Sequence, residues 1–341
     1  MSKDYWKDRA AQREQEAQLI ASKFLARMDE RLREAQQDVL RQIEAFYQRY
    51  AIENQVTIAE ARKYLTAKEL KDFKNIDLKR FRELSLSGNP EYDRILNATS
   101  YRVRISRLEA LNLTIEMRMA ELYGGANGLQ RYTYTGLSEV YQDSYYRSMF
   151  DLAKQGIVTG TVTALTDKTL EEVLTYNWSG KEFSKRIWGH QEATRLAIRK
   201  ELERSFASGR SAQKTIKAIM GVTDVTRSRV EALVRTESNF FHGAAAQRSY
   251  VDAGIDRYEI LATLDRRTSD ICRAQDGEVY AEKDYKPGVN APPFHVRCRS
   301  TTIPYFDESE YMVGEKRQSA NGLIDSMTYE EWHEKYVKQG D

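Results

Sequence analysis

The chain has 341 residues and a mean hydropathy of -0.68, and its 53 Lys or Arg nearly balance its 51 Asp or Glu, leaving a net charge of +2. This length fits two or three domains with cores large enough to fold without disulfides, which excludes a small disulfide scaffold. No stretch approaches the roughly 18 apolar residues of a transmembrane helix, so no membrane is required. Because the net charge is so small, any contact with DNA must come from a local group of basic residues.

The first fifty residues show the apolar spacing of one long helix. Apolar side chains recur every three or four positions, with one gap of seven, at Trp6, Ala10, Ala17, Ile20, Phe24, Met28, Leu32, Ala35, Val39, Ile43, Phe46 and Tyr50. This spacing predicts an amphipathic helix of about 45 residues, with a single apolar face. That face can be covered by other helices of the chain, by a binding partner, or by a second copy in self-association through long helices.

Further helices are predicted up to residue 155. Capping-box spacings at Thr57 and Thr66, each followed three residues later by Glu, predict two shorter helices. A second long helix is predicted from Asn89-Pro90 to Gly124, and a third over 129–155. The segment 157–165, rich in Thr and Val, fits a short strand or an extended linker equally well.

Helical spacing resumes over 181–207, 211–220 and 225–253. A glycine follows each of these segments: Gly209, Gly221 and Gly254. Because glycine is common just after the last helical residue, three separate helices are predicted here.

Basic residues outnumber acidic ones more than twofold in two stretches, 62–82 and 181–217. Such stretches are usually solvated helix faces, and the alternative is contact with DNA phosphates that does not depend on base sequence. The candidate DNA contacts are Lys63, Lys68, Lys71, Arg80, Lys185, Arg186, Arg195 and Lys200.

The pattern changes after Gly254, where short alternating segments replace helical spacing. Strands are predicted over 257–264 and 278–280, a short helix over 268–275 and a proline-rich loop over 286–299. The fold class is therefore mainly α, with long amphipathic helices followed by a small α+β module that holds a Cys/His cluster. The expected regions are a long-helical region 1–125, a second helical region 126–224, the module 225–306 and an acidic tail 307–341 that orders only on another surface.

Both cysteines of the chain fall in this module with one of its four histidines: Cys272, His295 and Cys298. Two thiolates and an imidazole suit tetrahedral Zn²⁺, which predicts a structural metal site. Two reduced packing cysteines, a cross-link, or a Cys-His nucleophile are the alternatives. The candidates for a fourth ligand are a water, Asp265, Asp270 and Asp276.

Two runs in the module also carry a family resemblance. Residues 265–277, DRRTSDICRAQDG, and 292–306, PPFHVRCRSTTIPYF, resemble the signature of the Mu F-like head morphogenesis family of tailed phages. The helix that precedes these runs is also similar to the corresponding helix of that family, at Arg235-Thr236-Glu237 and over 244–254. The resemblance therefore covers 225–306. Some members have a cysteine where this chain has Ser269, so one soft ligand of a four-ligand site is replaced here.

The resemblance implies a minor head protein, present in few copies inside the capsid or at its portal vertex. Its partners would be the portal protein and other capsid proteins, and its role head assembly with genome packaging or delivery. It implies no established enzymatic activity. Because the N-terminal segment lacks a signal peptide, we expect the host cytoplasm during assembly and the virion afterwards.

An enzyme housed in the module is the alternative function, either a metal-dependent nuclease or a transferase. Arg235 and Glu237 would be half of a transferase site. The simpler interpretation is an ion-pair contact, through Arg273 or Arg299, that joins the module to the helix that precedes it. A nuclease would need clustered carboxylates around an open metal, whereas this cluster has one histidine between two thiols.

Overall fold

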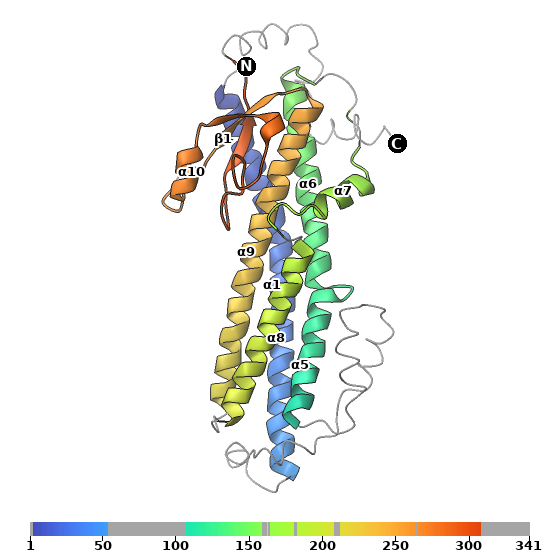
Figure 1. Cartoon of the computed structure of the whole chain (residues 1–341). Helices are drawn as coiled ribbons and strands as arrows, with labels where there is room; N and C mark the ends of the chain where they lie inside the picture. The colour runs from blue at the N-terminus through green and yellow to red at the C-terminus, as the bar shows by residue number, and fades with distance from the viewer. Residues whose placement is uncertain are drawn as a thin grey trace. The chain divides into compact units, whose positions relative to one another are not determined.

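The structure is a computed structural model that describes residues 3–53, 107–158, 162, 164–180, 183–207, 212–263 and 265–307 (Figure 1). The chain is mostly helical, with a small sheet late in the described part, as predicted. The helices before the sheet are α1 (Lys3–Glu53), α5 (Arg107–Gly124), α6 (Leu129–Lys154), α7 (Asp167–Leu174), α8 (Phe183–Ala207) and α9 (Ala212–Asp252). None of the described helices combines the length and apolarity needed to cross a membrane.

The prediction of one very long N-terminal helix is confirmed by α1, which has 51 residues. Apart from the partly exposed Ala35, the apolar residues that define its single face are buried from Trp6 to Phe46. This face is covered by the chain's own segments, so it is not a free surface for a partner. The helix forms because a periodic apolar stripe gains burial from Trp6 to Phe46.

Helices α5, α6 and α8 also lie where helical spacing was predicted. The two helices predicted at Thr57 and Thr66, the start of the predicted second long helix at Asn89-Pro90, and the tail beyond Asp307 lie outside the described residues.

The prediction of two helices separated at Gly221 is wrong, because α9 runs unbroken from Ala212 to Asp252. A glycine inside a helix costs only about 1 kcal/mol relative to alanine, and burial along α9 outweighs that cost. Gly254 does end the helix, since it adopts a positive φ of 68° that side-chain-bearing residues avoid.

The chain divides into two compact units, each of which gathers segments that are distant in sequence. Unit 1 consists of 1–25, 133–183 and 232–341, and unit 2 of 26–132 and 184–231. The consecutive regions expected from the sequence divide the chain differently, because α1, α6 and α9 each contribute residues to both units.

Unit 1 contains a buried ion pair between α1 and α6. The Arg13 guanidinium donates from Nη1 to Asp151 Oδ2 at 3.0 Å, and Arg9 donates from Nε to Asp151 Oδ1 at 2.6 Å. Arg13 and Asp151 are both buried, and Ser148 Oγ lies 3.4 Å from Arg13 Nη1. The pair fixes the register of these two helices, because a shift of either would leave a buried charge without its partner.

Unit 2 is joined by apolar contacts and by ion pairs that are less deeply buried. Arg118 of α5 pairs with Asp38 of α1 at 2.8 Å, and Arg227 of α9 pairs with Asp29 of α1 at 2.5 Å. These side chains remain partly exposed, so each pair contributes modestly to stability.

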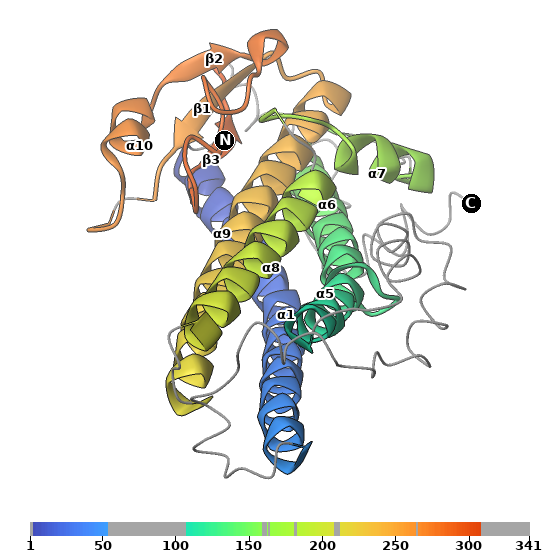
Figure 2. The same ribbon diagram turned by 60° about the horizontal axis from the view of Figure 1, so that its bottom comes forward.

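The sheet of unit 1 has three antiparallel strands in the order β2-β1-β3. It lies beside the last turns of α9 and the first turns of α1 (Figures 1 and 2). Its elements are β1 (Arg257–Leu261), α10 (Asp270–Gln275), β2 (Val279–Ala281), the 3₁₀ helix η2 (Glu282–Asp284) and β3 (Thr301–Pro304). The sequence predicted β1, α10 and β2 but missed β3, whose four residues are all buried and show no alternation of polar and apolar side chains.

Contacts from both ends of the described chain hold the sheet. Lys3 Nζ of α1 lies 2.7 Å from Glu259 Oε2 of β1, and the Trp6 ring lies 6.0 Å from that of Phe306. From α9, the Tyr250 hydroxyl donates to the Thr302 carbonyl at 3.0 Å. The module therefore forms part of a core that includes the first helix.

Candidate metal centre

Cys272 is positioned by the short helix α10. The Ser269 hydroxyl caps this helix by accepting a hydrogen bond from the Cys272 N–H at 3.3 Å. Such a cap satisfies an amide at the start of a helix and fixes the direction of its first turn. The Cys272 side chain is buried in a small apolar cluster with Ala262, Cys298 and Phe294.

His295 and Cys298 lie on the loop between Pro293 and β3, which follows a cis Pro292-Pro293 bond. Two buried side chains of α9 hold this loop. The Thr236 hydroxyl accepts from the Arg297 N–H at 3.0 Å, and Asn239 donates from Nδ2 to the Ser300 carbonyl at 2.9 Å. The positioning roles of Thr236 and Asn239 were not predicted; the available signal was the run of four polar residues, 236–239, inside a helix.

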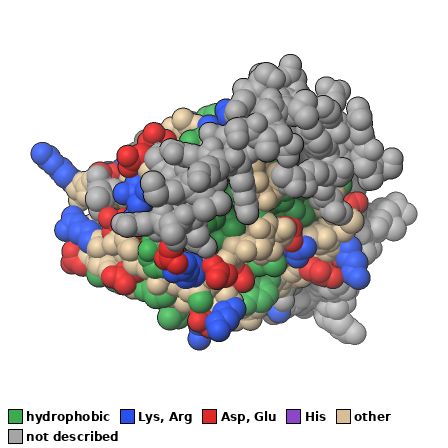
Figure 3. Space-filling model, turned by 90° about the horizontal axis from the view of Figure 1, so that it is seen from above, with side chains coloured by type: hydrophobic (Ala, Val, Ile, Leu, Met, Phe, Trp, Pro, Cys, Tyr) green, Lys and Arg blue, Asp and Glu red, His purple; other side chains and the backbone are tan. Residues whose placement is uncertain are grey.

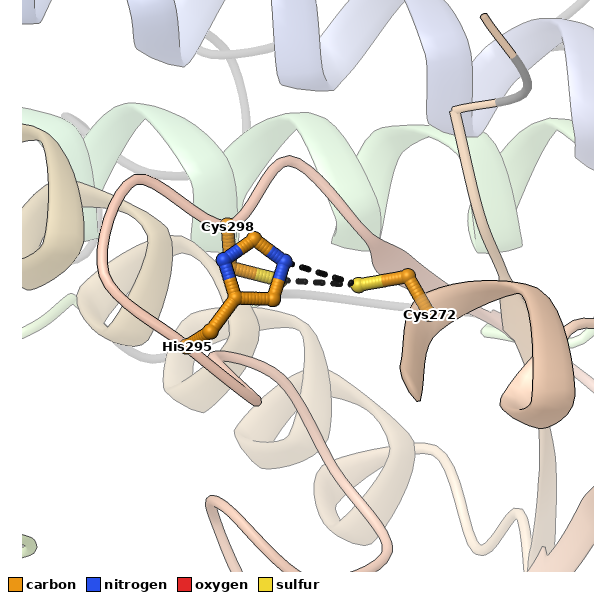
Figure 4. Close-up of side chains that lie close together, drawn as sticks. All are labelled: Cys272, His295 and Cys298. Carbon is orange, nitrogen blue, oxygen red and sulfur yellow. Dashed lines mark hydrogen bonds between the residues drawn. The ribbon is translucent and has the colours of Figure 1, made fainter. Parts of the chain in front are cut away.

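The side chains of Cys272, His295 and Cys298 converge (Figure 4). Cys272 Sγ lies 3.1 Å from His295 Nε2 and 3.7 Å from Cys298 Sγ, and the three potential ligand atoms lie within 4.8 Å of one another. Both cysteines are free thiols. Within the part of the chain that the structure describes, this is the only group of three or more Cys, His, Asp or Glu side chains close enough to hold one ion.

The environment of the two thiols differs from that of the imidazole. Both cysteines are buried, and burial raises the pKa of the Cys298 thiol, while backbone hydrogen bonds at Phe294 and Ser300 act in the opposite direction. His295 is half-exposed and its Nδ1 lies 2.8 Å from the Val296 carbonyl oxygen. The cluster is therefore reached from solvent on its histidine side.

Asp265, the candidate fourth ligand, is not part of this group. Both of its carboxylate oxygens accept from the Arg299 guanidinium at 2.7 Å, in a bidentate pair. The hydrogen bond from Arg299 is the main reason that the pKa of Asp265 is far below its usual range. The ion pair joins the loop before α10 to the residue that follows Cys298. It therefore holds together the two segments that carry Cys272 and Cys298.

Arg235 and Glu237 each contact a residue that was not predicted from the sequence. Arg235 donates from Nη1 to Gln18 Oε1 at 3.0 Å, and Glu237 Oε2 accepts from Trp178 Nε1 at 3.0 Å. Glu237 is buried and contacts the loop that follows α7; this helix was not predicted, although Thr166 caps its first turn.

The candidate DNA contacts are described only in part. Lys63, Lys68, Lys71 and Arg80 lie outside the described residues, whereas Lys185, Arg186, Arg195 and Lys200 lie on α8. Lys185 and Lys200 are exposed, but Arg195 is mostly buried and contacts Glu192 at 2.6 Å and Glu116 at 3.4 Å. A phosphate would have to compete with both carboxylates for Arg195. On the face drawn in Figure 3, acidic and basic side chains of the described residues are interspersed.

Comparisons with known proteins agree with the resemblance of the module. Residues 196–303 match the family model of Phage Mu protein F like protein, which confirms the predicted similarity and extends it into α8. An uncharacterized protein of Haemophilus influenzae is 26% identical over 88 residues, which are 26% of this chain and 20% of that protein. The match thus spans about a fifth of the length of that relative. No solved structure matches the chain significantly.

Proposed function

We propose that this chain is a minor head protein of a tailed phage, which acts as a structural component in head assembly and in genome packaging or delivery. The observation that carries the proposal is the family match over 196–303, because this segment contains the Cys/His cluster and the α9 side chains that hold it. The proposed location is the capsid interior or the portal vertex, with the portal protein and other capsid proteins as partners.

Exposed apolar side chains on the module are the proposed contact surface for those partners. Ile271 and Val296 are 55% and 64% exposed and directly adjoin Cys272 and His295 in sequence. Apolar side chains held on rigid elements are typical anchors of protein interfaces. The apolar face of α1 is already buried within the chain, so self-association through that face is a weaker candidate.

Quantitative mass spectrometry of purified particles tests this proposal. The chain is expected in few copies per particle, and particles assembled without it are expected to have normal-looking heads that package or deliver DNA poorly. Val296→Asp should lower incorporation without unfolding the chain, whereas Leu19→Asp, at a 57% exposed position of α1, should incorporate normally. Absence of the chain from particles, or equal incorporation of both variants, would contradict the proposed role or its contact surface respectively.

A structural role is favoured over a carboxylate-based nuclease because the cluster of the described residues contains no carboxylate. Metal-dependent nucleases use carboxylates around an open ion, but the carboxylate of Asp265 is held by Arg299. Variants of Cys272 that incorporate fully and fold normally, yet lose infectivity through a missing modification of DNA or protein, would replace the structural proposal with the enzymatic one.

Nonspecific DNA contact through α8 forms part of the proposal. Of the candidate contacts on this helix, Lys185 and Lys200 are exposed. Each phosphate contact contributes about -0.9 to the slope of log affinity against log salt, so Lys200→Gln should reduce that slope by about one unit. The matched control is Lys168→Gln on α7, where the lysine is exposed and outside the basic stretch. Fluorescence anisotropy with two unrelated duplexes checks this, and an affinity that ignores salt would rule out phosphate contact.

A further inference from the structure

We propose that Cys272, His295 and Cys298 bind one Zn²⁺ ion as a three-residue site whose fourth ligand is a water molecule and not a side chain of the described chain. This inference does not depend on the role in the phage head, because it concerns only the chemistry of the cluster. Binding replaces two S–H bonds with two Zn–S bonds and releases two protons to the solvent, so the loaded site carries no net charge.

The spacing of the two sulfur atoms fits a tetrahedral ion. Zinc–sulfur bonds of about 2.3 Å at a tetrahedral angle place two sulfurs about 3.8 Å apart, and the observed separation is 3.7 Å. The distance from Cys272 Sγ to His295 Nε2 is 3.1 Å, against about 3.5 Å in such a site. A small rotation of the half-exposed imidazole closes this difference, so the protein backbone need not move.

The histidine is already oriented as a ligand. Its Nδ1 lies 2.8 Å from the Val296 carbonyl oxygen, which can accept only if Nδ1 carries the proton. The other nitrogen, Nε2, then presents its lone pair toward the two sulfurs. Metal-bound histidines commonly use such a hydrogen bond to a backbone carbonyl to fix their tautomer and ring orientation.

The side chains that could supply a fourth ligand are held elsewhere. Asp265 forms the bidentate pair with Arg299, and Ser269 caps α10. Asp276 Oδ1 accepts from the Ala262 N–H at 2.8 Å, and Asp270 extends into solvent. Since the histidine side of the cluster is open to solvent, water is the ligand that can complete the shell.

Zinc titration of the reduced full-length chain tests the three-residue site. We expect one equivalent to be retained after dialysis, with a rise in melting temperature. Cys272→Ser and His295→Gln should each lower the zinc affinity at least tenfold. The matched control His190→Gln changes a half-buried histidine of α8 and should bind zinc as the unmodified chain does. Retention of less than about a tenth of an equivalent, with no change in melting temperature, would overturn the proposal.

X-ray absorption at the zinc edge tests the fourth ligand. We expect two sulfurs, one nitrogen and one oxygen, and the same spectrum for Asp265→Asn and Ser269→Ala. Ser269→Cys creates a Cys-x-x-Cys pair, so a third sulfur should replace the oxygen and tighten binding at least tenfold. Loss of the oxygen in either of the first two variants would make that residue the ligand. A purified chain whose denatured mass is lower by two hydrogens would reveal a disulfide and overturn the zinc site.

Discussion

Replacing Asp151 with Asn is expected to lower the free energy of unfolding by about 3–5 kcal/mol. The substitution keeps the size of the side chain but removes the charge that Arg13 and Arg9 approach at 3.0 and 2.6 Å. Arg13 is buried, so its guanidinium would be left without a counter-charge in a region that water does not reach. Denaturant-induced unfolding followed by circular dichroism measures the loss.

A surface carboxylate provides the matched control for this prediction. Asp270 pairs with Arg273 at 3.5 Å but is almost fully exposed, so Asp270→Asn should change stability by less than about 0.5 kcal/mol. Combining Asp151→Leu with Arg13→Met should recover part of the loss, because an apolar pair of similar volume removes both buried charges. A loss below about 1 kcal/mol for Asp151→Asn alone would mean that the pair is hydrated.

Acidification is expected to destabilise unit 1 through His242. This histidine of α9 is buried between Ser144 of α6 and Thr301 of β3, whose hydroxyl oxygens lie 2.8 and 3.1 Å from its two ring nitrogens. Burial lowers the pKa of His242 to about 3, and the charge of Arg13 acts in the same direction. Below pH 6.5 the unfolded chain therefore binds a proton at His242 that the folded chain does not.

Because the pKa of His242 is lower in the folded chain, its contribution to the free energy of unfolding is fully present above about pH 6.5. This contribution declines as the pH falls toward 3. At pH 5 the loss from His242 alone amounts to about 2 kcal/mol. His242→Gln removes this titration but leaves the carboxylates unchanged. The difference in unfolding free energy between the original chain and His242→Gln should therefore change by about 2 kcal/mol between pH 7.5 and 5. A difference that stays constant would show that His242 takes up its proton equally in the folded and the unfolded chain, which contradicts the prediction.

The long helices were predictable from the sequence because their signal is repeated many times. In α1, nearly every turn adds another apolar residue to the same face, so the pattern survives the one gap of seven residues. The helix end predicted at Gly221 was wrong because it depended on a single residue. A single glycine is a local signal, and its small cost is outweighed by packing that only the folded structure reveals.

Elements that depend on distant contacts were harder to predict. Strand β3 is buried on both faces by segments from elsewhere in the chain, so its short sequence has no pattern of its own. The division into two units likewise follows the packing of helices that come together from distant positions. Neither feature has a local signature in the sequence.

The Cys/His cluster was predictable as a set of residues but not as a geometry. Soft ligands are rare in this chain, so finding both cysteines and a histidine within 27 residues indicated that they meet. The sequence could not show which carboxylate, if any, is a fourth ligand, because Asp265 forms an ion pair with Arg299, which is 34 residues away in the chain. Thr236 and Asn239 act on the loop across 61 residues, and no spacing rule connects them to it.

The composition of unit 1 has a consequence for how the protein is made. Its core needs residues 3–25, which leave the ribosome early, and residues after 232, which leave it late. Until the later segment emerges, Trp6 and its neighbours have no sheet to pack against, whereas the segments of unit 2 are all available once residue 231 has emerged. Unit 1 can therefore complete its fold only after the segment that begins at residue 232 has emerged, whereas unit 2 can complete its fold before that point.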